Sequence, residues 1–94
     1  MRNTTAQRAR LSAMVTDNDP VTRLVLVAAL QEMGFTTEVA EDAAAALETA
    51  HRAMPDLILL DAQMPHMNGF ETCSAIREMS GGEDVPILIA TGRD

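Results

Sequence analysis

A run of large aliphatic residues that ends in an aspartate constrains this chain more than any other feature. Residues 57–60 read Leu-Ile-Leu-Leu, and Asp61 follows them directly. A run this short is unusual for a helix and is typical of a strand buried on both faces, as in parallel sheets. Open sheets of that kind bind ligands at the carboxyl ends of their strands, so Asp61 is predicted to lie at a binding site.

The rest of the chain alternates between strand-like and helix-like segments. Strands are predicted at residues 11–16, 35–40 and 85–90, the second of them at a sheet edge. Each predicted helix follows a residue that caps helix N-termini and stops at a residue that ends helices. The bounding pairs are Asp19 and Gly34, Asp42 and Pro55, and Asn68 and Gly81-Gly82. This alternation with short connections predicts a parallel α/β sheet with right-handed crossovers.

Apolar residues recur at helical spacing in the first and third predicted helices. In the first helix, apolar residues recur at helical spacing at Val21, Leu24, Val25 and Ala28. In the third helix, the residues predicted to face inward are Phe70, Cys73, Ile76 and Met79.

Composition limits the classes of function. The chain has 94 residues, enough for one small domain at 11–94 after a polar lead-in at 1–10 that we expect to be disordered. A net charge of −7 argues against direct nucleic-acid binding and suits a site that holds a cation. The apolar runs are too short to span a membrane. A single cysteine, Cys73, cannot form an internal disulfide and is compatible with the reducing cytoplasm.

Three separated motifs, in this order, resemble the receiver domain of bacterial response regulators. The first is an acidic cluster after the first strand, the second is Asp61 with a Met-Pro-x-x-Asn-Gly turn, and the third is a threonine after the last strand. Their residues here are Asp17-Asn18-Asp19, Asp61 with Met64 to Gly69, and Thr91. The resemblance runs from about Leu11 to Asp94. It implies a flavodoxin-like doubly wound sheet with strand order 2-1-3-4, in which Asp17 and Asn18 lie beside Asp61.

The resemblance also implies a mechanism for two-component signalling (phosphorelay). Asp61 would accept a phosphoryl group from a phosphohistidine on a sensor histidine kinase or a histidine phosphotransfer protein. Mg²⁺ would be held by Asp17, Asn18, Asp61 and the backbone carbonyl of Gln63, and the Thr91 hydroxyl would bind the phosphoryl group and act as a switch for an output module. Gln63 and Arg93 match positions that modulate the lifetime of the aspartyl phosphate. Such a protein is a phosphoacceptor with at most self-catalysed transfer, not a conventional enzyme.

Two departures from the family pattern bear on the metal and on the fold. Receivers carry a carboxylate where this chain has Asn18, so we expect weaker Mg²⁺ binding. Asp19 either supplies the missing charge or caps the following helix, and its position before Pro20 favours the cap. The family's phosphate-binding lysine ends a fifth strand, but the sequence contains no lysine and stops before the fourth helix, fifth strand and fifth helix.

Without those elements, one face of the sheet is expected to lie open. An output domain or partner chain beyond Asp94, or a second copy of this chain, would then cover it. Two other functions stay open from the sequence. One is a pseudo-receiver that docks or dimerises without phosphate turnover. The other is a phosphohydrolase of the haloacid-dehalogenase kind, which Gln63 disfavours because those enzymes need a second aspartate at that position.

Overall fold

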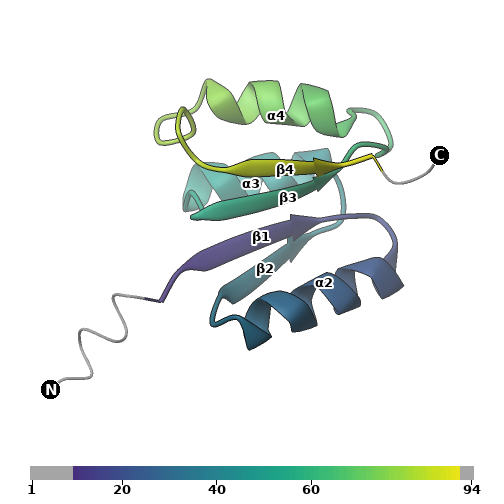
Figure 1. Ribbon diagram of the computed structural model, residues 1–94. Coiled ribbons are helices and arrows are strands. Elements are labelled where there is room, and N and C mark those ends of the chain that lie inside the picture. The colour runs from purple at the N-terminus through teal and green to yellow at the C-terminus, as the bar shows by residue number, and fades with distance from the viewer. Residues whose placement is uncertain (1–9, 92–94) are drawn as a thin grey trace, which may run out of the picture.

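The computed structural model describes residues 10–91, which form a four-stranded parallel sheet with helices on both faces (Figure 1). The elements are β1 (Ser12–Thr16), α2 (Pro20–Glu32), β2 (Thr36–Ala40), α3 (Ala43–Arg52), β3 (Leu57–Asp61), α4 (Gly69–Arg77) and β4 (Ile87–Ala90). The strand order β2-β1-β3-β4 confirms the predicted flavodoxin-like arrangement, with β2 at an edge.

Each described helix begins at the cap that the sequence predicts. The Asp19 and Asp42 carboxylates accept hydrogen bonds from the N–H groups of Thr22 and Ala45. Asn68 forms a capping box with Glu71, in which each side chain accepts from the other residue's backbone N–H. None of the helices in residues 10–91 is long and apolar enough to cross a membrane.

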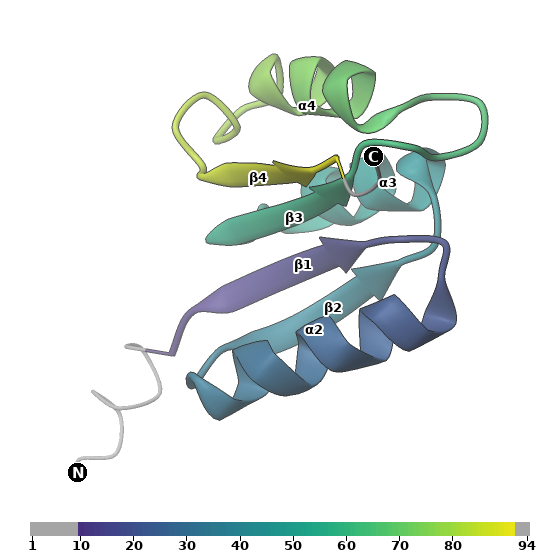
Figure 2. The same cartoon turned by 45° about the vertical axis from the view of Figure 1, so that its right-hand side comes forward.

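The main core lies between the sheet and the helices α3 and α4, which share one side of the sheet (Figure 2). Met14, Ile58, Leu60 and Ile76 are fully buried there. The alanines of α3 allow that helix to approach the sheet closely, and Ala46 is fully buried. This face of the sheet is therefore closed by two helices.

The opposite face is only partly covered, because α2 is the sole described helix on it (Figure 1). Its buried residues are Ala13, Val15 and Leu30. Leu59 is half-buried and its neighbour in β4, Leu88, is 59% exposed. The expectation of an open sheet face is confirmed, while the expectation that residues 57–60 are buried on both faces is correct for one face alone.

The faces of two helices differ from what spacing suggests. Phe70 is 55% exposed, so its predicted inward position is wrong, whereas Ile76 is fully buried and Cys73 and Met79 pack partly against the core. In α2, Val21, Leu24 and Val25 are 67%, 69% and 60% exposed. The sheet-facing side chains of α2 are instead Leu26, Val27 and Leu30.

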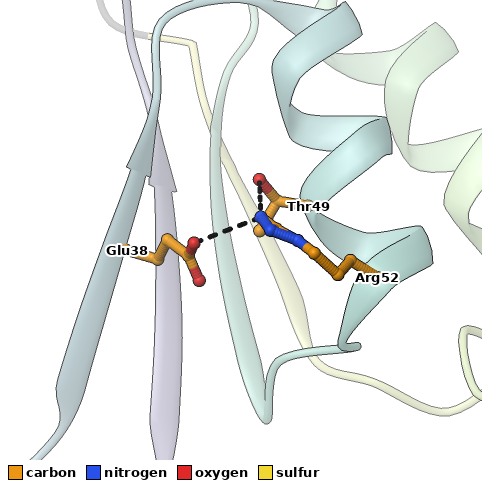
Figure 3. Close-up of polar contacts among 3 residues, drawn as sticks. All are labelled: Glu38, Thr49 and Arg52. Carbon is orange, nitrogen blue, oxygen red and sulfur yellow. Dashed lines mark hydrogen bonds and ion pairs between the residues drawn. The ribbon is translucent and has the colours of Figure 1, made fainter.

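An exposed ion pair joins the edge strand β2 to the end of α3 (Figure 3). The Arg52 guanidinium lies 3.3 Å from the Glu38 carboxylate and also donates to the Thr49 hydroxyl. Both charged side chains are more than half exposed, so the pair contributes about 0–1 kcal/mol to stability.

Candidate functional site

The carboxyl ends of β1, β3 and β4 border a cleft of about 420 Å³. Its lining comprises Asp17, Asn18, Asp19, Thr22, Asp61, Gln63, Ala90 and Thr91. The structure therefore brings together every site residue predicted from the sequence except Arg93, which lies outside the described residues, as do residues 1–9 of the predicted lead-in.

Asp61 ends β3 and is held in a defined orientation. Its Oδ1 accepts a hydrogen bond of 3.0 Å from the Gln63 N–H. The residue opposite it in β4 is Ala90, which places Thr91 one residue further along, at the same rim of the cleft. One carboxylate oxygen of Asp61 is thus held by the Gln63 N–H, and the Asp17 carboxyl lies within hydrogen-bonding reach of the Asp61 carboxylate.

A close contact behind Asp61 requires glycine at the start of α4. The Gly69 N–H donates to the Ala62 carbonyl at 3.0 Å. A Cβ atom on Gly69 would lie 2.5 Å from the Asp61 carbonyl oxygen, too close for any real side chain. Sequence reasoning used the Asn-Gly pair as a turn and helix start but missed this contact with the strand.

Asp17 is the buried acid of the site, with 9% of its surface exposed. Its N–H donates to the Ala40 carbonyl, and its Oδ1 accepts from the Asp19 N–H at 2.9 Å. Burial raises the pKa of the Asp17 carboxyl, and the nearby charges of Asp61 and Asp19 raise this pKa further, against the opposing effect of the Asp19 N–H. The cleft therefore holds a carboxylate that other anions destabilise.

Asp19 serves as a helix cap rather than as an additional free acid. Its carboxylate accepts hydrogen bonds from both the N–H and the hydroxyl of Thr22, and these bonds lower the pKa of Asp19. Both of these bonds go to the Oδ2 atom of Asp19, so the cap commits that oxygen to α2. The sequence preference for the cap is confirmed.

The donors around the cleft fit a weak Mg²⁺ site. Within residues 10–91 no group of three or more His, Cys, Asp or Glu side chains is arranged to hold a metal ion. The available donors are the carboxylates of Asp17 and Asp61, the Asn18 side chain and backbone oxygens. Mg²⁺ prefers oxygen ligands and keeps several waters, so two carboxylates with neutral oxygens suffice for it. A divalent ion between them would also relieve the repulsion that raises the pKa of Asp17.

Sequence reasoning missed Arg23. This residue lies one turn into α2, and its Nη1 donates to the Asp17 backbone carbonyl at 2.7 Å. A basic residue four positions after a helix cap is a common pattern, so the sequence offers no specific signal for a contact that runs back into the preceding turn.

Comparison with known proteins identifies the family. The sequence pattern of the response regulator receiver domain matches residues 13–94, so this chain belongs to the response regulator receiver domain family of two-component signalling. The response regulator MprA of Mycobacterium ulcerans is 41% identical over 81 residues, which cover 86% of this chain and 34% of MprA. The chain spans about a third of the length of the MprA response regulators that it matches.

Solved receiver structures share the fold. Chemotaxis response regulator CheY4 of Vibrio cholerae has a TM-score of 0.83 and 33% identity, with 86% of this chain and 68% of CheY4 covered. The receiver domain of a sensor histidine kinase from Pseudomonas aeruginosa has a TM-score of 0.84 and 28% identity, with 90% of this chain and 70% of that domain covered. The latter structure has a magnesium ion coordinated in its active site cleft.

Proposed function

We propose that this chain accepts a phosphoryl group on Asp61 from a phosphohistidine donor and acts as a conformational switch. The observation that carries this proposal is the placement of Asp61 and Asp17 in one cleft, with Thr91 at the same rim. Family membership supports it, because the receiver-domain match at residues 13–94 includes all three of these positions.

Asp17, Asn18, Asp61 and the Gln63 backbone carbonyl would hold Mg²⁺. The ion supplies the positive charge that lets an anionic nucleophile meet an anionic phosphoryl group. The pKa of Asp17 is raised first by burial and then by the charges of Asp61 and Asp19, and a cation held beside these carboxylates would offset the part that is due to the charges. The magnesium ion in the Pseudomonas receiver supports this assignment by similarity.

In the proposed transfer, the second carboxylate oxygen of Asp61 attacks phosphorus while the phosphorus–nitrogen bond of the donor breaks in line. The bond electrons return to the donor imidazole, and Asp61 becomes an acyl phosphate. The Gln63 N–H holds the other oxygen at 3.0 Å and so aims the attacking one. The Thr91 hydroxyl donates to a phosphoryl oxygen and reports its presence.

The proposed partners follow from this chemistry. The donor is a sensor histidine kinase or a histidine phosphotransfer protein in the cytoplasm. The output is a domain or partner chain beyond Asp94, or a second copy of this chain, and the open sheet face around Leu88 supports such a covering partner.

Treatment with acetyl phosphate and Mg²⁺ tests the proposal. We expect the intact protein to gain the mass of one phosphoryl group, and beryllofluoride to shift the amide resonances around Asp61 and Thr91. Asp61→Asn should abolish both responses, whereas Asp84→Asn, at an exposed position away from the cleft, should keep them.

No mass gain and no shift in the wild type would instead favour a pseudo-receiver that docks without phosphate turnover. One observation favours that second function: Asn18 stands where receivers carry an acidic ligand.

A further inference from the structure

Arg23 is a cation beside the acidic cleft that the proposed transfer does not use. The guanidinium is half-buried and returns from the second turn of α2 to the Asp17 carbonyl. Two other arginines are engaged elsewhere: Arg52 pairs with Glu38, and Arg77 donates to carbonyl groups in the loop before β4.

The Arg23 contact completes the hydrogen bonding of Asp17. The N–H of Asp17 donates to Ala40, its Oδ1 accepts from the Asp19 N–H, and its carbonyl accepts from Arg23. Three bonds that leave in three directions define the orientation of one residue. They also define the turn that carries Asn18, because that turn begins at the Asp17 carbonyl.

We propose that Arg23 is a positioning residue, whose guanidinium locks the turn between β1 and α2 so that Asp17 and Asn18 present their oxygens to a divalent cation. The role rests on the proposed function, since it concerns the same Mg²⁺ site. A guanidinium suits it because its planar, rigid donor set holds a carbonyl in one direction, whereas the lysine ammonium is a flexible point charge.

Charge and positioning predict opposite effects of removing Arg23. If the guanidinium acted through its charge alone, its loss would strengthen Mg²⁺ binding, because it would remove repulsion between two cations. If it positions the turn, its loss weakens Mg²⁺ binding despite the more negative cleft. The sign of the change in affinity therefore separates the two roles.

The test compares Arg23→Gln and Arg23→Lys with the wild type in the 94-residue chain. Mg²⁺ alone is titrated while amide resonances around Asp61 are followed, and hydrogen exchange of the Asp19 N–H is measured without metal. We expect Arg23→Gln to bind Mg²⁺ about tenfold more weakly, as when a group that orients a metal ligand is removed. Exchange at Asp19 should become faster, and Arg23→Lys should fall between the two proteins in both measurements.

Arg52→Gln is the matched control, because it removes an arginine from an exposed ion pair in α3 and should change neither measurement. Thermal unfolding verifies that each variant is folded during the titration. Unchanged or tighter Mg²⁺ binding by folded Arg23→Gln would overturn the positioning role while the proposed function stands. A wild type that binds no Mg²⁺ would overturn both.

Discussion

At the scale of single residues, the ionised form of Asp17 is unfavourable in the fold. Asp17 is nearly buried, and its pKa is raised by burial and by the charges of Asp61 and Asp19. A raised pKa means that the folded chain holds the proton more tightly than the unfolded chain does. The ionised carboxylate therefore destabilises the metal-free fold at neutral pH, and this penalty is relieved as the pH falls from the raised pKa to the ordinary one.

Replacement of Asp17 by Asn should accordingly stabilise the metal-free chain. The amide oxygen can still accept from the Asp19 N–H, but the charge is gone. We expect a gain of about 0.5–2 kcal/mol in the free energy of unfolding at pH 7. This gain in the free energy of unfolding should shrink as the pH is lowered. Urea unfolding at several acidic pH values measures it.

Millimolar Mg²⁺ provides the complementary measurement for Asp17→Asn. The ion should raise the stability of the wild type, because it binds the folded state, and leave the variant almost unchanged. A variant that is less stable than the wild type without metal would contradict the electrostatic account of Asp17.

The Asn18→Asp substitution should strengthen Mg²⁺ binding. A unit charge about 4 Å from another is worth roughly 4 kcal/mol at an effective dielectric constant near 20, and ligand desolvation offsets a large part of it. We expect at least a tenfold fall in Kd, or about 1.4 kcal/mol, by amide titration. Ser74→Asp, which adds the same charge at an exposed position of α4, should leave the affinity unchanged.

Thr16 and Thr72 form a matched pair of buried threonines with opposite expectations. The Thr16 hydroxyl has no hydrogen-bond partner within residues 10–91, whereas the Thr72 hydroxyl donates to the Asn68 carbonyl at 2.8 Å. Thr16→Val should raise the unfolding free energy by about 1 kcal/mol, because it removes an unpaired buried polar group. Thr72→Val should lower it by about 0.5–1.5 kcal/mol. Equal signs for the two changes would contradict this assignment.

At the scale of elements, the strand β3 and the helix α4 act as one unit that places Asp61. The capping box of Asn68 and Glu71 fixes the first turn of α4, and the Gly69 N–H ties that turn to Ala62. The helix can approach the strand this closely because Gly69 has no side chain. The backbone of Asp61 is therefore held between β4 on one side and the start of α4 on the other.

A Gly69→Ala change should destabilise the chain despite the higher helix propensity of alanine. Propensity favours Ala by up to about 1 kcal/mol, but the added Cβ meets the Asp61 carbonyl, and overpacking of this kind costs about 1–3 kcal/mol. We expect lower stability and shifted resonances at Asp61. Ser74→Ala, in the exposed part of the same helix, should be neutral or slightly stabilising, and a stabilised Gly69→Ala would contradict the contact.

At the scale of the whole molecule, the two faces of the sheet are unequal. The face under α3 and α4 holds the larger core, while the face beside α2 holds a cavity of about 310 Å³ bordered by Leu26, Leu59 and Leu88. The helix α2, which carries the exposed Val21, Leu24 and Val25, lies on this side of the sheet (Figure 2). Stability therefore rests mainly on the first face, while the second keeps apolar side chains in contact with solvent.

Two of the leucines of α2 test this division. Leu30 is 6% exposed and Leu24 is 69% exposed. Leu30→Ala should lower the unfolding free energy by about 2–5 kcal/mol, whereas Leu24→Ala should change it by no more than about 0.5 kcal/mol. Urea unfolding of the two variants measures the difference, and similar losses would mean that α2 packs through the other face.

Much of the architecture was determined by local sequence signals. Capping by Asp19, Asp42 and Asn68 depends on short-range hydrogen bonds, so each helix start was predictable. The alternation of strands and helices then limits the topology to a parallel sheet. Parallel strands place their carboxyl ends at one edge, but it was the strand order implied by the resemblance to receiver domains that predicted Asp17 and Asp61 as neighbours.

Only the tertiary structure decided which helix faces turn inward and how the site is supported. The apolar residues of α2 run around the helix, from Leu24 and Val25 to Leu26 and Val27, so spacing cannot select the buried side; packing on β1 and β2 does. Likewise, the Gly69 contact with Asp61 arises between residues that the turn brings together. The period of apolar residues indicates which side chains a helix can bury. The neighbouring strands and helices determine which of them it does bury.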